Sequence, residues 1–245
     1  MKIIILAAGQ GVRLRPLTDT KPKCMVEYNE KSIIDHLLQT IKECSIDDIS
    51  IVNGYKKEVL EEHLRDEKIS FYTNERYFNT NMVSTLFCAK EEMDDDIIIS
   101  YADIIYQKEV LEKLLKSNED FSVVIDKKWK DLWDQRMENP IDDAETLKVK
   151  DGNIVEIGKK PESYNEIAGQ YIGLIKISKN AINKVISFYE SLDKTTMYDG
   201  KDFDNMYMTS FIQSIINNIM DVKPVYIEGG WLEIDSLEDL KSYAV

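Results

Sequence analysis

The sequence contains few of the residues that build cross-linked or histidine-based sites. Its three cysteines, Cys24, Cys44 and Cys88, are odd in number and far apart, which does not favour a disulfide framework or a zinc site. They fit a reduced, cytoplasmic protein better. The only histidines are His36 and His63, and we expect both to serve packing or solvation. Chemistry that depends on histidine is therefore not expected.

Long apolar runs and an excess of positive charge are also missing. The apolar start ends at Ala8, which is too short for a membrane span or a signal-peptide core, so we expect no targeting segment and no membrane partner. Asp and Glu total 45 against 31 Lys and Arg, and the net charge is −14. Because nucleic acids attract basic surfaces, we expect no nucleic-acid partner. A polyphosphate ligand would need local cations and a divalent metal.

The N-terminal stretch is the most informative part of the sequence. Residues 3–6 form an unbroken apolar run, which is typical of a strand buried on both faces of a parallel sheet. The small residues at 7–9 and Gly11 leave the next turn nearly free of side chains, so a phosphate chain or a flat base can approach main-chain N–H groups. Arg13 and Lys23 add cationic donors. The stretch predicts a nucleotide site at the end of the first strand.

Other glycine-rich motifs fit this stretch less well. A dinucleotide-binding motif needs Gly or Ala at position 14, where the sequence has Leu14. A Walker-type phosphate loop needs Gly-Lys-Ser or Gly-Lys-Thr after the turn, and the sequence has neither. A purely structural turn is the remaining alternative.

Apolar patterns further along the chain alternate between the periods of strands and helices. Helical spacing predicts a helix from residue 33, with Ser32 as its N-cap, and a short helix over 57–65. Strands are predicted at 49–52, 69–72, 97–99 and 121–125, and a hairpin over 147–157. This alternation predicts one α/β domain over 1–245 with a mainly parallel sheet, whose ligands bind at the carboxyl ends of the strands.

Two aspartates are candidates for a metal or ribose site. Asp103 follows the predicted strand at 97–99, and the end of such a strand opens on the ligand crevice. Asp235 follows another apolar segment and is the best candidate for a partner acid. It has an alternative role as the cap of a terminal helix, with Ser236 and Asp239 forming a box-like pair, and both roles are compatible.

The middle of the chain offers candidates for contacts with a second substrate. Trp129 and Trp133 either enclose an ammonium group, together with the carboxylates of the acidic stretch at 142–145, or form one packing face of a helix. Lys160, beside Lys159, suits a phosphate or phosphonate dianion. Asn81 either caps a helix that begins near residue 82 or contacts the nucleotide or the acceptor. The residues alone leave these alternatives open.

The N-terminal residues read Leu6-Ala7-Ala8-Gly9-x-Gly11-x-Arg13-Leu14, then Pro16-Leu17-Thr18 and Lys21-Pro22-Lys23. This string resembles the signature of nucleotidyltransferases, which join a nucleoside triphosphate to a phosphorylated small molecule. The resemblance implies a Rossmann-like three-layer sandwich around a mixed, mainly parallel sheet, of the nucleotide-diphospho-sugar transferase type. It implies catalytic roles for Arg13 at the β- and γ-phosphates and Lys23 at the α-phosphate, with Mg²⁺ on Asp103 and Asp235. The implied nucleotide contacts are Leu6, Ala7, Ala8, Gly9, Gln10, Gly11, Arg13 and Lys23.

Over nearly all its length the chain resembles cytidylyltransferases of the phosphocholine, 2-aminoethylphosphonate and phosphoglutamine types. The resemblance implies CTP as the nucleotide, release of pyrophosphate, and small amine-bearing phosphorus acids as acceptors. A sugar-1-phosphate nucleotidyltransferase is an alternative, although Ala102 and Lys159 depart from the pattern of those members. A noncatalytic nucleotide-sensing subunit is a second alternative. The expected partners are small-molecule substrates and a second copy of the chain in a homodimer.

Overall fold

The first strand is buried on both faces, as its sequence predicts. The computed structural model describes residues 1–243, and in it β1 (Lys2–Leu6) alternates its side chains between two cores. Ile3 and Ile5 enter one core, while Ile4 and Leu6 enter the other. Successive side chains of a strand point to opposite faces, so a continuous apolar run is required where both faces are covered.

Strands and helices alternate along most of the chain. The other strands are β2 (Glu27–Tyr28), β3 (Lys31–Ser32), β4 (Ile49–Asn53), β5 (Ile69–Thr73), β6 (Ile97–Tyr101), β7 (Ile104–Tyr106), β8 (Phe121–Asp126), β9 (Leu147–Lys150), β10 (Asn153–Ile157), β11 (Gln170–Ile177), β12 (Lys223–Ile227) and β13 (Trp231–Glu233). The helices are α1 (Ile33–Glu43), α2 (Lys57–His63), α3 (Met82–Phe87), α4 (Lys108–Leu115), α5 (Trp129–Arg136), α6 (Lys179–Ser191), α7 (Met208–Asn218) and α8 (Leu237–Ser242). Within residues 1–243, no helix has the length and apolarity that a membrane crossing needs.

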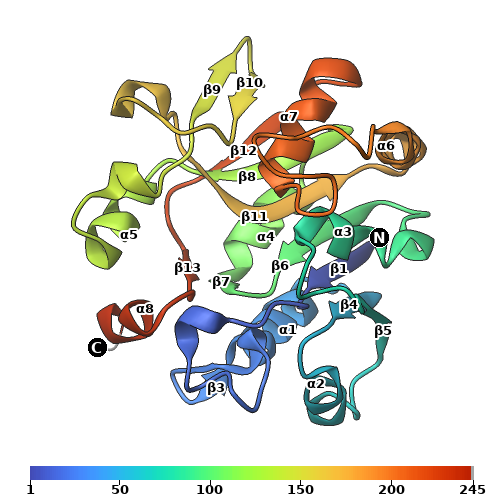
Figure 1. The fold of residues 1–245 in the computed structure, drawn as a ribbon, viewed down its shortest axis with the longest axis vertical. Coiled ribbons are helices and arrows are strands. Elements are labelled where there is room, and N and C mark those ends of the chain that lie inside the picture. The colour runs from blue at the N-terminus through green and yellow to red at the C-terminus, as the bar shows by residue number, and fades with distance from the viewer. Residues whose placement is uncertain (244–245) are drawn as a thin grey trace.

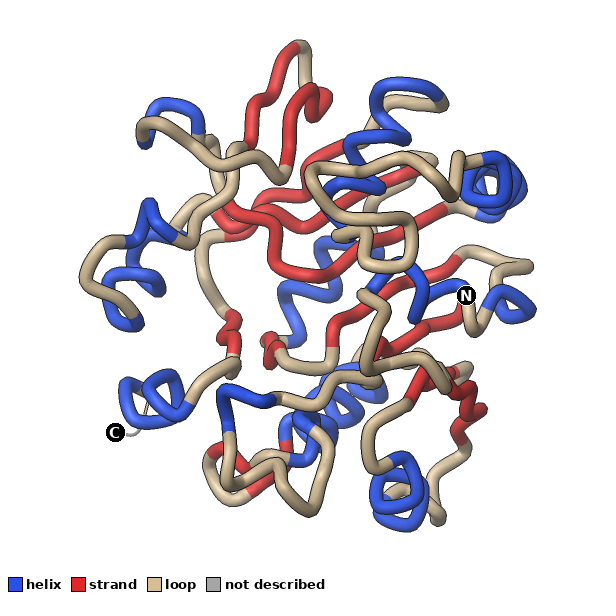
Figure 2. The backbone as a smooth tube through the Cα atoms, viewed as in Figure 1, coloured by secondary structure: helices blue, strands red, loops and turns tan. Residues whose placement is uncertain are grey.

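Seven strands form the main sheet, in the order β12-β8-β11-β6-β1-β4-β5 (Figure 2). Strand β1 is parallel to β4 and β6, and β8 is parallel to β12. Strand β11 runs antiparallel to its two neighbours, β6 and β8. The predicted mixed, mainly parallel sheet is therefore confirmed. The strands β7 and β13 pair outside this sheet as a short antiparallel ribbon.

Helices cover both faces of the sheet (Figure 1). Helices α1 and α4 bury side chains such as Leu37 and Leu111 in one core, which also contains Leu60 of α2. Helices α3, α6 and α7 bury side chains in the other core, Val185 and Ile212 among them. The sheet between two helical layers is the predicted three-layer sandwich.

Two helix caps form where the sequence predicts them, whereas the alternative role of Asp235 as the cap of the terminal helix is wrong, because Ser236 takes that position. Ser32 caps α1 and Asn81 caps α3, each through its side-chain oxygen. Ser236 caps α8 in a capping box with Asp239. Asp235 therefore precedes the cap and leaves its carboxylate available for other contacts.

Predicted element boundaries differ from the observed ones only slightly. The predicted helix over 57–65 is α2, which ends at His63 because Leu64 leaves helical geometry and its side chain is buried. The predicted hairpin over 147–157 is formed by β9 and β10.

A buried aspartate connects the main sheet to the β7/β13 ribbon. Asp126 ends β8 and is 1% exposed. Its Oδ2 accepts a hydrogen bond from Trp231 Nε1 at 2.8 Å. Its Oδ1 accepts hydrogen bonds from the backbone N–H groups of Lys128 and Gly229, both at 2.8 Å. Because Trp231 begins β13, this carboxylate fixes the position at which the ribbon starts.

We predict that Asp126→Ala lowers the free energy of unfolding by about 3 kcal/mol, because it leaves the buried Trp231 Nε1–H and two partly buried backbone N–H groups without a charged acceptor. Urea unfolding followed by circular dichroism measures the change. Asp66→Ala, which removes a carboxylate that is 94% exposed, is the matched control and should unfold like the wild type. An unchanged urea midpoint in Asp126→Ala would contradict the structural role given to this residue.

Candidate active site

Two adjoining cavities open at the carboxyl ends of central strands. The larger, of about 340 Å³, lies where β1 and β6 end. The smaller, of about 180 Å³, is lined by residues of α5, β11, α7 and β13. Met82 and Tyr101 line both cavities, so the two share a wall. Open α/β sheets bind their ligands at this edge, so both cavities are candidates for substrate sites.

The turn after β1 lines the larger cavity. Leu6, Ala7, Ala8, Gly9, Gly11 and Arg13 all face it, together with Val12, whereas Gln10 is not among its lining residues. The small side chains leave main-chain groups accessible there. The predicted nucleotide contacts are thus gathered on one wall, with Gln10 as the exception.

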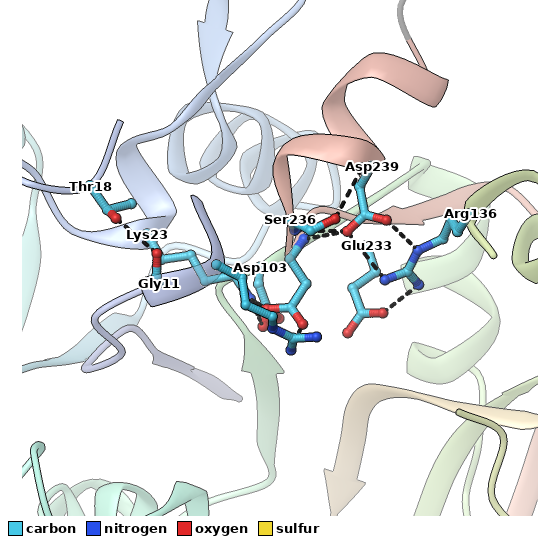
Figure 3. Close-up of polar contacts among 10 residues, drawn as sticks. Gly11, Thr18, Lys23, Asp103, Arg136, Glu233, Ser236 and Asp239 are labelled. Atoms are coloured by element: carbon cyan, nitrogen blue, oxygen red, sulfur yellow. Dashed lines mark hydrogen bonds and ion pairs between the residues drawn. The ribbon is translucent and has the colours of Figure 1, made fainter. Parts of the chain in front are cut away.

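Gly11 allows the turn to pack against the residues that follow it. Its φ is +61°, which is in the left-handed region. A Cβ atom on Gly11 would lie 2.9 Å from the Cβ of Lys23, which is too close. The hydroxyl of Thr18, a fully buried residue, donates to the Gly11 carbonyl at 2.8 Å (Figure 3). The turn is therefore held in a fixed position next to Lys23.

Lys23 lies between the two predicted metal ligands, Asp103 and Asp235. Its Nζ donates to Asp103 Oδ2 at 2.7 Å and to Asp235 Oδ1 at 2.6 Å. The Arg13 guanidinium contacts the other oxygen of Asp235. Lys23 and Asp235 are 13% and 16% exposed at their side chains, so solvent screens these charges only partly. The structure thus brings all four of the predicted catalytic and metal-binding residues together.

The two aspartates have the chemistry of a site for a hard divalent cation. Asp103 Oδ1 is buried and has no hydrogen-bond partner, so one ligand position is free. Mg²⁺ is commonly held by one or two carboxylates, with water and substrate phosphates completing its shell. Within residues 1–243, no group of three or more His, Cys, Asp or Glu side chains is arranged so that it could hold a metal ion, so a cage made of protein ligands alone is not formed there. Asp103 and Asp235 fit a metal that arrives with a phosphate.

The smaller cavity has acidic and aromatic walls. Asp143, Glu145 and Glu233 contribute carboxylates, and the aromatic lining comes from Trp133, Trp231, Tyr101, Tyr171 and Tyr207. Burial raises the pKa of Glu233, and the Arg136 guanidinium opposes that rise. Carboxylates beside aromatic faces attract a cationic group. The smaller cavity therefore suits a ligand that carries an ammonium group.

Glu145 is the carboxylate of this cavity that most needs a cation. Its backbone is fixed by Gln170, whose side chain accepts from Glu145 N at 2.9 Å and donates to Glu145 O at 2.6 Å. Its carboxylate accepts one long hydrogen bond, from Thr209 Oγ1 at 3.4 Å. Burial, aided by the neighbouring acids Asp143, Asp199 and Glu233, raises the pKa of Glu145 to about 7. A bound cation would stabilise its ionised form.

The predicted acceptor residues are not all brought to the cavities. Asn81 lines the larger cavity and Trp133 the smaller one. Trp129 is buried edge-on against Trp133, with ring centroids 5.8 Å apart, and lines neither. The two rings form the packing face that the sequence left open. Lys160 Nζ donates to the carbonyls of Ile141 and Asp142, and it also lines neither cavity.

Of the acids of the smaller cavity, Asp143 and Glu145 belong to the acidic stretch predicted beside the tryptophans, whereas Glu233 was not predicted. Glu233 stands two residues before Asp235, and residues two apart in an extended chain face the same side, which is a signal that could have identified it. The acidic stretch indicated Glu145, but its exact place depends on the contact with Gln170 at the start of β11.

Similarity to known proteins agrees with this geometry. Residues 2–132 match the family model described as nucleotidyl transferase. The chain is 48% identical to a CTP:phosphoglutamine cytidylyltransferase of Campylobacter jejuni, over 98% of each protein. It is 28% identical to a choline-phosphate cytidylyltransferase of Streptococcus pneumoniae, over 98% of this chain and 96% of the relative.

A solved structure shares the fold. The CTP:phosphocholine cytidylyltransferase of Streptococcus pneumoniae superposes with a TM-score of 0.72 at 25% identity. The superposition covers 98% of this chain and 96% of the other. It confirms the predicted sandwich around a mixed sheet.

We predict that Glu145→Gln stabilises the protein at about pH 8 by about 2 kcal/mol and has little effect at about pH 4. The raised pKa means that the folded state holds the Glu145 proton more tightly than the unfolded state. Stability from this group is therefore full below the unfolded pKa of 4.5 and is lost as the pH rises to about 7. Urea unfolding at both pH values measures the difference, with the exposed Glu138→Gln as control. Equal effects of Glu145→Gln at the two pH values would contradict the prediction.

Proposed function

Since this chain belongs to the nucleotidyl transferase family and is a nucleotidyltransferase, we propose that it transfers CMP from CTP to a small amine-bearing phosphorus acid and releases pyrophosphate. The family and the enzyme class were both predicted from the N-terminal signature and are confirmed. CTP is supported by the names of the relatives from Campylobacter jejuni and Streptococcus pneumoniae. The 48% identity over 98% of each protein favours a phosphoglutamine-type acceptor, with phosphocholine and 2-aminoethylphosphonate as related candidates.

The division of charge between the two cavities carries this proposal. Arg13 and Lys23 supply cations to the larger cavity, where a triphosphate would lie. Glu145 and Glu233 supply carboxylates to the smaller cavity, where an ammonium group would lie. Because the two cavities share a wall, a ligand in each can present its reacting group to the other. A neutral sugar would make less use of the acidic wall.

The reaction requires little proton transfer from the protein. An ionised oxygen of the acceptor attacks the α-phosphorus of CTP, a new P–O bond forms, and the bond to the β-phosphate oxygen breaks. Lys23 would leave its carboxylate partners to contact the α-phosphate, and Arg13 would hold the leaving pyrophosphate. Mg²⁺, held by Asp103 and Asp235, would supply further neutralisation of phosphate charge when bound. Positioning and charge neutralisation therefore account for catalysis.

The other expectations about partners, setting and metal remain predictions. Small-molecule substrates follow from the enzyme class. The homodimer, the cytoplasmic setting and the identity of the metal as Mg²⁺ stay predictions. Contacts of Asn81 and Lys160 with the acceptor also stay predictions.

We predict that Lys23→Ala lowers turnover by about a hundredfold, which corresponds to roughly 3 kcal/mol of lost transition-state stabilisation. Release of pyrophosphate from CTP and the acceptor measures the rate. Lys21→Ala, two residues away and paired with Glu27 on the surface, is the matched control and should retain the wild-type rate. Wild-type turnover in Lys23→Ala would overturn its catalytic assignment.

An acceptor panel tests the proposed substrate class. Pyrophosphate release should be fastest with CTP among the four ribonucleoside triphosphates. It should be faster with phosphoglutamine, phosphocholine or 2-aminoethylphosphonate than with glucose 1-phosphate. Glu145→Gln should raise the KM of the best amine-bearing acceptor about tenfold, because it removes the charge facing the ammonium group. A preference for glucose 1-phosphate would favour the sugar-1-phosphate alternative.

A further inference from the structure

A buried guanidinium lies between the smaller cavity and helix α8. The side chain of Arg136, the last residue of α5, is 4% exposed. Its Nη1 donates to Glu233 at 2.6 Å and its Nε donates to Asp239 at 2.7 Å (Figure 3). It also lies over the ring of Trp133, 5.2 Å from the centroid. Arg136 therefore contacts two walls of the smaller cavity, an acid and an aromatic ring.

Asp239 extends this contact to the metal ligand. Its Oδ2 accepts hydrogen bonds from the backbone N–H groups of Asp235 at 2.9 Å and Ser236 at 2.8 Å. Its Oδ1 accepts from Arg136. The backbone of Asp235 is thus fixed through a carboxylate that is itself only 4% exposed and held by the guanidinium.

One short segment carries the residues that face both cavities. Glu233 ends β13 and lines the smaller cavity, and Asp235 follows two residues later and lines the larger one. Ile234 between them is fully buried and donates its N–H to the carbonyl of Asp103 at 2.9 Å. Arg136 contacts this segment directly at Glu233 and reaches the backbone N–H of Asp235 through Asp239.

We propose that Arg136 is a positioning residue that sets the acceptor acid Glu233 directly and the metal ligand Asp235 through Asp239. The assignment of the two cavities rests on the proposed function. Arg136 touches no reacting atom and acts through the two acids. A planar guanidinium suits this role because its fixed donors hold two carboxylates at once, which an ammonium group does less well.

The roles of Arg136, Glu233 and Asp239 can be separated by the effects of their variants on two different measurements. Binding of Mn²⁺, measured by electron paramagnetic resonance with a non-hydrolysable CTP analogue present, reports on Asp235. The KM of the acceptor, with kcat, reports on Glu233. Neither quantity follows from thermal stability alone.

Each variant has its own expected pattern. Asp239→Asn should weaken Mn²⁺ binding about tenfold and leave the acceptor KM within twofold, because one amide oxygen cannot serve both the backbone N–H groups and Arg136. Glu233→Gln should raise the acceptor KM about tenfold and leave Mn²⁺ binding within twofold. Arg136→Gln should both weaken Mn²⁺ binding and raise the acceptor KM. The double variant Arg136→Gln/Asp239→Asn should bind Mn²⁺ no more weakly than Arg136→Gln alone, because both changes break the same contacts from Arg136 through Asp239 to Asp235.

Two further variants separate positioning from folding. Arg136→Lys keeps the positive charge but loses the fixed, planar donors of the guanidinium. It should therefore weaken Mn²⁺ binding and raise the acceptor KM even if Arg136→Gln does not fold. Lys176→Met removes a different buried cation, 6% exposed and bonded to the carbonyls of Leu115 and Ser117. It should lower the melting temperature without moving Mn²⁺ binding or the acceptor KM.

Wild-type Mn²⁺ binding in both Arg136→Lys and Asp239→Asn would overturn the proposal, because the path to Asp235 would then have no effect. An Arg136→Lys protein that loses only thermal stability, like Lys176→Met, would overturn it as well. Failure of the proposed function would be recognised differently. The wild type would then release no pyrophosphate with any amine-bearing acceptor, whatever the Mn²⁺ affinities of the variants.

Discussion

The contact of Lys23 with Asp103 and Asp235 is the interaction on which the site depends. It joins residues that are 80 and 212 positions apart in the chain. Two carboxylates this close to one ammonium would repel each other without a cation between them, because partial burial weakens solvent screening. The cluster forms because the turn after β1, the end of β6 and the segment after β13 meet at one edge of the sheet. A local sequence motif therefore becomes half of a site only through the fold.

The antiparallel strand β11 and the β7/β13 ribbon provide the other half. Strand β11 begins at Gln170, which fixes Glu145 at the wall of the smaller cavity. The ribbon positions Glu233, and Asp126 fixes where that ribbon starts through Trp231. The charged residues that line the smaller cavity are acids, whereas the larger cavity adds the cations Arg13 and Lys23, so an ammonium group and a phosphate chain are attracted to different cavities.

The sequence predicted those parts of the site whose position is set by a single strand or by the turn that follows it. The apolar run of β1, the glycine turn, and the acids directly after β6 and β13 are each local signals, and the signature supplied roles for Arg13 and Lys23. Lys160 and Trp129 were harder to place, because the direction of a side chain outside the strand ends depends on its neighbours. Trp129 is packed against Trp133, and Lys160 satisfies backbone carbonyls instead of facing a cavity. Glu145 was predicted only as part of an acidic stretch, because a residue 25 positions away fixes its place in the cavity.

The distribution of these residues along the chain separates the reaction from its acceptor. The family model matches residues 2–132, which include the glycine turn, Lys23 and Asp103. Glu145, Glu233 and Asp235 lie beyond that range, in the part that supplies the acidic cavity and the second of the proposed metal ligands. A match over residues 2–132 supports phosphate chemistry alone, because this part of the chain contains Arg13, Lys23 and Asp103 but none of the acids of the smaller cavity. Acceptor choice needs the second part, and the similarity to a phosphoglutamine enzyme extends over it as well. Because Glu233 contacts Arg136 directly and Asp235 is linked to it through Asp239, a change at Arg136 would act on the proposed acceptor wall and on the proposed metal ligand together.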